Sequence, residues 1–324
     1  MIRPTLAFAF AFALLVMTAS PVFAATLFVS NETDNTVTVL DSNTLKTIKT
    51  IPVSRRPRGI VMNPNHKEVY VAAGDSDIID VIDTQKLAVT RHLQSGPDPE
   101  LMAVDHKGEK MYIANEDDSQ VTIMDIASGK VLGTVAVGVE PEGMAVSPDD
   151  KYTVCTSEST SMAHVIDNAS MKLVANVLVD TRPREAKFTA DGSQVWVSSE
   201  VGGSISVIDT KTWTIIKKIG FAVEGVRPEL LQPVGMEFSK DGKLLFAALG
   251  PANRVAVIDA KTYEVKQYIL VGQRPWHMAL DPDGAKLYVA NGLTNDMTII
   301  DVARLEAERS VPVGRLPWGV AVMP

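Results

Sequence analysis

The arginines of this chain gather in short segments that run up to and just past a recurring proline. Eight of the twelve arginines after residue 24 lie in these segments, and none of the 18 lysines does. A guanidinium group grips a carboxylate or phosphate through two parallel hydrogen bonds, which an ammonium group cannot do. If the segments meet in the fold, they predict an anion-binding mouth. The eight arginines are Arg55, Arg56, Arg58, Arg182, Arg184, Arg227, Arg274 and Arg315.

The residue that follows each proline adds aromatic surface to this chemistry. Two of these residues are tryptophans, Trp276 and Trp318, and His277 follows the first of them. Aromatic rings beside arginines suit a planar anionic ligand, which can stack on a ring while guanidinium groups bind its charges. We therefore expect a ligand site, and neither a catalytic nor a metal site. Its expected residues are Arg58, Glu100, Glu142, Arg184, Arg274, Trp276, His277 and Trp318.

A purely structural interpretation of the same residues stays open. Carboxylates such as Asp98 and Glu140 share the segments and could pair with the arginines, tying neighbouring parts of the fold together. Lys187 and Glu237, each four residues after its proline, could form a buried ion pair in the same way. The acidic runs 75–77 and 116–118 have no calcium-loop spacing, and no two histidines have metal-ligand spacing, so we expect solvated loops there.

The elements that must position these residues repeat along the chain. Triplets resembling Val-Ile-Asp end at aspartates 42 residues apart, with one interval of 50, and the prolines follow the same spacing. Strand-like repeats of 40–45 residues are typical of β-propeller blades. The aspartates are Asp41, Asp83, Asp125, Asp167, Asp209, Asp259 and Asp301. The prolines are Pro57, Pro99, Pro141, Pro183, Pro233, Pro275 and Pro317.

One repeat indicates how a blade is built. Residues 275–280, 287–290 and 297–300 predict three strands separated by polar turns, and a fourth strand is expected near 310–313. Residues 26–30 and 318–323 supply the second and first strands of a shared blade, so pairing of the two ends closes the ring. We predict an all-β, seven-bladed propeller with four antiparallel strands per blade, formed by residues 25–324. The one interval of 50 residues contains eight more than the others. These eight residues fall within 220–232 and are either a tolerated insertion or a partner-binding loop.

The start of the chain predicts export. Arg3, the apolar residues 6–17 and small residues before Ala25 are typical of a secretory signal peptide spanning residues 1–24. No later stretch is long and apolar enough to span a membrane, so we expect a soluble protein in the periplasm or outside the cell. We also expect a monomer. The net charge of -8 disfavours general nucleic-acid binding. Cys155, the only cysteine, aligns with strand valines and predicts a buried thiol.

The amino-acid sequences of the repeats resemble those of a known family. Residues 111–115 (MYIAN) and 287–291 (LYVAN), with the triplets and turns described above, resemble YVTN-family β-propeller repeats. In its length, its predicted signal peptide and its repeat sequences, the chain is similar to the PQQ-dependent catabolism-associated β-propeller proteins. This resemblance implies a periplasmic accessory role in alcohol catabolism, with a quinoprotein dehydrogenase or a transport component as partner and pyrroloquinoline quinone (PQQ) as ligand. The chain lacks the eight repeats and the cysteine pair of those dehydrogenases themselves.

Three classes of function are compatible with these residues. A non-catalytic binding or accessory protein is favoured, because no nucleophile elbow, phosphate loop or metal helix is present. The first alternative is a propeller enzyme such as a lactonase, which would use Glu, His and Arg at the same mouth. The second is a propeller that binds nucleic acid or a cell surface.

Overall fold

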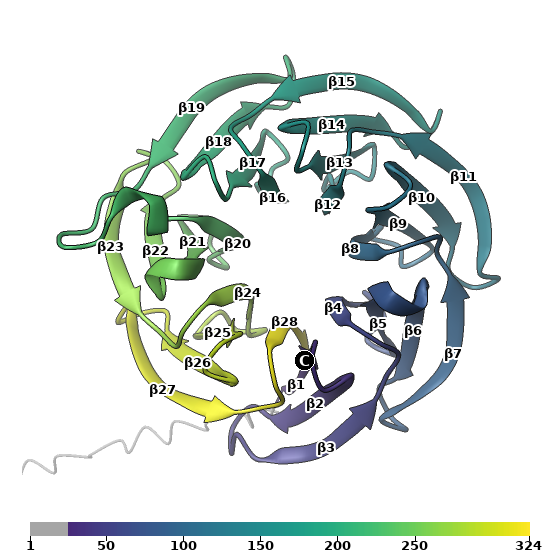
Figure 1. Cartoon of the computed structure of the whole chain (residues 1–324), viewed down its shortest axis with the longest axis horizontal. Coiled ribbons are helices and arrows are strands. Elements are labelled where there is room, and N and C mark those ends of the chain that lie inside the picture. Colours follow the sequence, from purple (N-terminus) through teal and green to yellow (C-terminus); the bar gives the residue numbers. More distant parts are fainter. Residues whose placement is uncertain (1–24) are drawn as a thin grey trace, which may run out of the picture.

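Seven four-stranded sheets stand around a central axis as the blades of a propeller (Figure 1). The computed structural model describes residues 25–324, and the predicted signal peptide, residues 1–24, lies outside them. Neighbouring strands within each blade are antiparallel. The architecture predicted from the 42-residue repeat is therefore confirmed.

Each blade runs from an innermost strand at the axis to an outermost strand at the rim. Blade 1 holds β28 (Pro317–Met323), β1 (Thr26–Asn31), β2 (Thr36–Asp41) and β3 (Thr47–Pro52). Blade 2 holds β4 (Pro57–Met62), β5 (Glu68–Ala73), β6 (Ile78–Asp83) and β7 (Ala88–Gln94). Blade 3 holds β8 (Pro99–Val104), β9 (Lys110–Asn115), β10 (Gln120–Asp125) and β11 (Lys130–Ala136). Blade 4 holds β12 (Pro141–Val146), β13 (Tyr152–Ser157), β14 (Met162–Asp167) and β15 (Lys172–Leu178).

The remaining three blades follow the same order. Blade 5 holds β16 (Pro183–Phe188), β17 (Gln194–Ser199), β18 (Ser204–Asp209) and β19 (Thr214–Gly220). Blade 6 holds β20 (Pro233–Phe238), β21 (Leu244–Leu249), β22 (Arg254–Asp259) and β23 (Val265–Leu270). Blade 7 holds β24 (Pro275–Leu280), β25 (Lys286–Asn291), β26 (Asp296–Asp301) and β27 (Glu306–Pro312). Three short 3-10 helices are η1 (Gly74–Ser76), η2 (Pro228–Leu230) and η3 (Gly250–Ala252).

Pairing of the two chain ends closes the ring as predicted. Strand β28 pairs antiparallel with β1, with Val320 opposite Val29 and Val322 opposite Leu27. Leu27 and Val29 are fully buried, so the closing pair also belongs to the core. The closure covers the inner edge of β1, at which another chain could otherwise add a strand.

The outermost strand of blade 7 differs from its prediction. It was expected near residues 310–313, whereas β27 begins at Glu306. Most of its side chains face solvent, so the strand has none of the apolar alternation by which a buried strand is found in a sequence.

The hydrophobic core lies between adjacent blades. Trp196 on β17 is fully buried and packs edge-on against Phe238 of β20, with ring centroids 5.6 Å apart. Cys155 is likewise fully buried, in a cluster that joins blades 3 and 4, as predicted. Burying one large apolar side chain stabilises a fold by roughly 1.5–3 kcal/mol, so packing between the blades contributes strongly to the stability of the ring.

Glycines allow the blades to approach closely at the axis. A Cβ atom on Gly59 would lie 2.3 Å from the carbonyl oxygen of Glu100 in the next blade, and one on Gly143 would lie 2.2 Å from that of Arg184. Since both partners are backbone atoms, neither can move aside cheaply. In these two blades, the third residue of the innermost strand is therefore glycine because the next backbone passes directly beside it.

The eight inserted residues are part of the fold. They lie between β19 and β20, where η2 begins at Pro228. Leu231 is buried, and Phe221 and Val223 pack against the core between blades 5 and 6. The tip around Glu224 and Gly225 stays exposed. Across residues 25–324, the structure contains no helix that is long and apolar enough to cross a membrane.

Candidate functional site

One face of the ring carries the loops between the second and third strands and the segments that enter the innermost strands. We call this face the top and its centre the mouth. The two sets of loops touch in each blade: the amide of Glu116 donates to the carbonyl of Asp98, and that of Glu200 donates to the carbonyl of Arg182. The predicted meeting of these segments is therefore confirmed.

A tight turn fixes the residue before the recurring proline of each repeat, which we call the marker proline. Arg56, Asp98, Arg182 and Arg274 all have a left-handed backbone, with φ of 58°, 43°, 60° and 58°. Such a conformation is costly for a non-glycine residue unless its surroundings hold it. Here the preceding blade does so: Asn35 accepts a hydrogen bond from the amide of Arg56 (2.9 Å), and Asn253 accepts one from that of Arg274 (2.9 Å). The turn aims these side chains at the mouth.

Five arginines and seven carboxylates meet there and form what we call the mouth cluster. The arginines are Arg56, Arg58, Arg182, Arg184 and Arg274. The carboxylates are Glu32, Asp98, Glu100, Glu116, Glu142, Glu158 and Glu200. Carboxylates outnumber guanidinium groups by seven to five, so the mouth is not a cationic surface.

One half of the cluster is acidic. Arg56 donates to Asp98 and, at 2.6 Å, to Glu100. Arg58 donates to the same Glu100 oxygen at 2.9 Å and to Glu32 at 3.2 Å. We call the two arginines with Glu32, Asp98, Glu100 and Glu116 the acidic half, because it holds four carboxylates against two guanidinium groups.

The other half is balanced. Arg184 is buried and lies 3.0 Å from Glu142, 3.7 Å from Glu200 and within hydrogen-bonding distance of Glu158. Arg182 also reaches Glu158 (2.8 Å), and Arg274 reaches Glu200 (2.7 Å). Three guanidinium groups thus face three carboxylates across blades 4, 5 and 7. The structural alternative, in which the arginines tie blades together, describes this half.

Burial and mutual repulsion shift the carboxylates. Burial first, and then the charge of Glu142, raise the pKa of Glu100 well above its usual value. Burial raises the pKa of Glu142 as well, and that of Glu158 to about 7, although Arg184 lowers both. The pKa of Asp98 also rises, chiefly through burial and despite its contact with Arg56. These carboxylates hold a proton more readily than exposed ones, chiefly because burial disfavours their charged forms.

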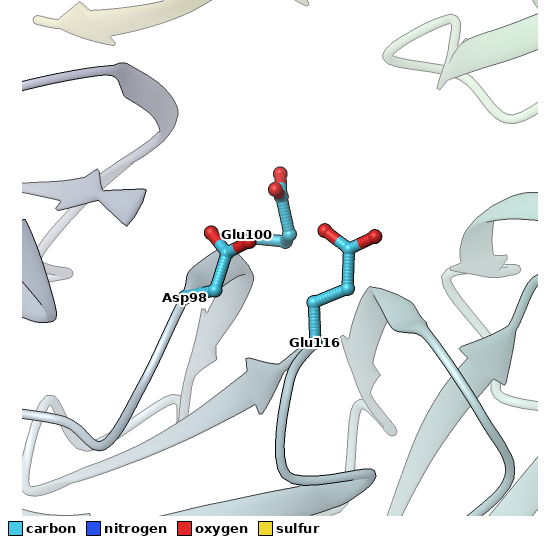
Figure 2. A group of neighbouring side chains, drawn as sticks. All are labelled: Asp98, Glu100 and Glu116. Atoms are coloured by element: carbon cyan, nitrogen blue, oxygen red, sulfur yellow. The ribbon is translucent and has the colours of Figure 1, made fainter. Parts of the chain in front are cut away.

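Three carboxylates of the acidic half converge (Figure 2). Asp98 precedes β8, Glu100 is its second residue, and Glu116 follows β9 in the same blade. One oxygen of each side chain lies within 4.8 Å of the others. Glu100 is buried and its Oε2 has no hydrogen-bond partner, while Glu116 makes no ion pair within residues 25–324. These residues could hold a metal ion, although the sequence predicted only solvated acidic loops.

The structure divides the predicted ligand residues between two levels. Arg58, Glu100, Glu142, Arg184 and Arg274 belong to the mouth cluster. Trp276 is half-buried beside them, with the Arg274 guanidinium 4.2 Å from its ring centroid. His277 and Trp318 instead line a cavity further along the channel, with their ring centroids 4.1 Å apart. Trp318 also stacks on Trp276, with ring centroids 6.3 Å apart, so its ring connects this cavity with the mouth.

The glutamates that begin the loops after the second strands were not predicted as site residues. Glu32, Glu158 and Glu200 hold mouth arginines, and Glu116 completes the acidic trio. A signal for them exists, since Glu116, Glu158 and Glu200 follow one another at the 42-residue spacing of the blades and Glu32 lies two periods earlier. The predicted pair of Lys187 and Glu237 is present, with Nζ and Oε2 3.0 Å apart, but it is partly exposed and not buried as expected.

Comparison with known proteins places this geometry in a wider group. Residues 60–289 match the family model described as the choice-of-anchor I domain. Among curated proteins, no match is found. Hydrazine synthase of Kuenenia stuttgartiensis is 20% identical, with a TM-score of 0.78 over 90% of this chain and 99% of that one. A putative 6-phosphogluconolactonase from Bacteroides fragilis is 18% identical, with a TM-score of 0.79 over 94% and 99%.

A more distant likeness extends the same fold to a larger protein. Dihydro-heme d1 dehydrogenase is 18% identical, with a TM-score of 0.67 over 94% of this chain and 76% of that one. Identities this low show a shared propeller fold, which hosts many functions.

Proposed function

Because the chain belongs to the choice-of-anchor I domain family, we propose that it is an exported, surface-associated binding protein without a catalytic role, and that its ligand site is the mouth. We further propose that a divalent cation, calcium, binds the acidic half of the mouth cluster. The family name supports an extracellular or surface location. The cation follows from the charges of the mouth.

The observation that supports the calcium site is the convergence of Asp98, Glu100 and Glu116. Calcium binds oxygen ligands at 2.3–2.6 Å, so two oxygens on one ion lie at most about 5 Å apart. The trio meets this limit, since its oxygens lie within 4.8 Å of one another. A cation there would also give the buried Oε2 of Glu100 its missing partner.

The affinity expected for this site is low. Three carboxylates supply fewer than the six to eight oxygens that calcium takes, so water or a ligand must fill the other positions. The positive charge of Arg56, bonded to two members of the trio, opposes the ion further. We therefore expect a dissociation constant of about 0.1–1 mM, as in extracellular calcium modules.

A calcium titration of residues 25–324 tests this proposal. At about ten times the dissociation constant, binding adds roughly 1.4 kcal/mol to the free energy of unfolding, which thermal denaturation detects. Glu116→Gln should weaken binding at least tenfold, whereas Asp117→Asn, which changes the adjacent exposed carboxylate, should not. A melting temperature that stays constant up to 10 mM calcium, or equal effects of the two variants, would contradict the proposal.

The resemblance to PQQ-associated propellers of the YVTN type adds a proposed setting, the periplasm, beside quinoprotein alcohol oxidation. There, pyrroloquinoline quinone is the first anionic ligand to test. The mouth arginines already donate to carboxylates, so an anion has to bind through the calcium ion or displace a glutamate. Quinone binding should therefore need calcium. Equal binding in excess chelator would instead assign the quinone to the arginines alone.

The lactonase alternative has less support from the geometry. It requires His, Glu and Arg side chains that are free at one mouth. His277 lies in the separate cavity, and Arg184 is engaged by three carboxylates.

A further inference from the structure

The lower part of the channel is a separate cavity of about 620 Å³, which we call the funnel. The innermost strands of all seven blades line it, and it reaches the bottom face between the turns that hold His106, Pro148 and Thr189. Arg58, Glu100, Glu142 and Arg184 are not part of its wall. Because Glu100, Glu142 and Arg184 are buried, the mouth cluster forms a plug above the funnel.

Slightly more than half of the funnel wall is apolar. Aliphatic, thioether and aromatic side chains surround the space on every blade but one, among them Ile60, Leu101, Met144, Phe188, Met278 and Val320. Cavities of this volume and lining bind small molecules whose apolar body is removed from water. The funnel itself supplies this apolar surface, whatever occupies the mouth.

A compact polar group interrupts the apolar wall on blades 5, 6 and 7. Lys187 Nζ lies 3.0 Å from Glu237 Oε2 and 3.7 Å from Glu185 Oε1. The second oxygen of Glu185 accepts the amide of Met236 and lies 3.8 Å from Nδ1 of His277. The side chains of Lys187 and Glu237 are 29% and 24% exposed, and both line the cavity, so this group is accessible from the funnel.

The charges of this group are not balanced. Two carboxylates share one ammonium group, and His277 is neutral, because burial and nearby Arg184 and Lys187 lower its pKa well below the usual value. Burial raises the pKa of Glu185 to about 7, although Lys187 lowers it. The Nε2 atom of buried His277 has no hydrogen-bond partner. The amide of Phe238 also donates to the second oxygen of Glu237, so each carboxylate oxygen of the group has one donor or cation beside it and can accept a further hydrogen bond.

We propose that the funnel binds an amphipathic amine, whose apolar body fills the cavity and whose ammonium group is held by Glu185 and Glu237. An ammonium group brings three donors and one positive charge, which complements the two carboxylates beside Lys187. An anionic group on the ligand would be repelled by the two carboxylates and would have to compete with them for Lys187. This site does not depend on the mouth, so its test is independent of the calcium titration.

Three fluorescent probes with the same aromatic body test the charge of the ligand. Dansylcadaverine carries an ammonium group, N-butyl dansylamide is neutral, and dansylglycine carries a carboxylate. Titrated into residues 25–324 at pH 8, the amine should bind at least tenfold more tightly than the neutral probe, and the acid should bind most weakly. Tighter binding of the acid, or no binding of the amine at 1 mM, would overturn the proposal.

Two variants with opposite expected effects locate the site. Glu237→Gln should weaken binding of the amine at least tenfold, whereas Lys187→Met should strengthen it, because the carboxylates lose their competing partner. The control is Glu264→Gln on the exposed turn before β23. A substitution that only loosens the fold would weaken binding in both variants, and that result would overturn the assignment. If one variant fails to fold, the other still tests the proposal, because the direction of its effect on binding of the amine is predicted.

Discussion

Replacing Arg184 with methionine should destabilise the ring strongly and in a pH-dependent way. The side chain is buried and contacts Glu142, Glu158 and Glu200. Arg182 and Arg274 remain for Glu158 and Glu200, but Glu142 loses its only ion-pair partner within residues 25–324. Removing one partner of a buried pair costs about 3–5 kcal/mol. We expect this loss in the free energy of unfolding at pH 8.

The pH dependence separates lost charge from lost packing. Without Arg184, the pKa of Glu142 should rise further. A carboxyl group whose pKa is raised in the folded state makes the free energy of unfolding of the protein fall as the pH increases. The penalty should therefore shrink as the pH is lowered from 8 to 5, because protonation removes the uncompensated charge of Glu142. Urea denaturation at both pH values measures it. Arg304→Met, at an exposed ion pair, is the control and should cost less than about 1 kcal/mol. Equal losses for the two variants at pH 8, or a penalty that does not change with pH, would refute this reasoning.

Two further predictions concern the whole ring. A chain ending at Arg315 loses β28 and exposes the inner edge of β1, so it should melt far below the full domain; equal melting temperatures by circular dichroism would disprove closure as a source of stability. Between pH 6.5 and 8 the folded state retains protons on Glu158 and Glu185, whose pKa values are about 7, so these two groups should together lower the free energy of unfolding by about 1.5 kcal/mol. Glu185→Gln should roughly halve this fall, and an unchanged slope would contradict the shift.

The sequence predicts the fold well because each blade repeats the same signals. Apolar alternation, polar turns and the marker prolines recur every 42 residues, so errors in one repeat are corrected by the others. The start of β27 escaped prediction because exposed side chains carry no such pattern. The signal peptide at residues 1–24 and the periplasmic location remain predictions.

The site is harder to predict than the fold. Marker prolines correctly indicate which residues approach the axis, but not whether an arginine there is free or paired, because its partners, such as Glu200, come from a different strand connection. Whether a side chain reaches the mouth or the funnel also depends on local irregularities in the innermost strand. A β-bulge between Pro275 and Met278 breaks the simple alternation of β24 and directs His277 into the funnel. Such bulges are not visible in the sequence.

Anomalous diffraction from crystals soaked in terbium, which substitutes for calcium, tests the proposed cation site most directly. The acidic half of the mouth cluster predicts one strong peak about 2.3–2.6 Å from oxygens of Asp98, Glu100 and Glu116. The peak should disappear in Glu116→Gln and persist in Asp117→Asn. No peak at the mouth, or a peak that survives Glu116→Gln, would contradict the assignment of a cation to these carboxylates.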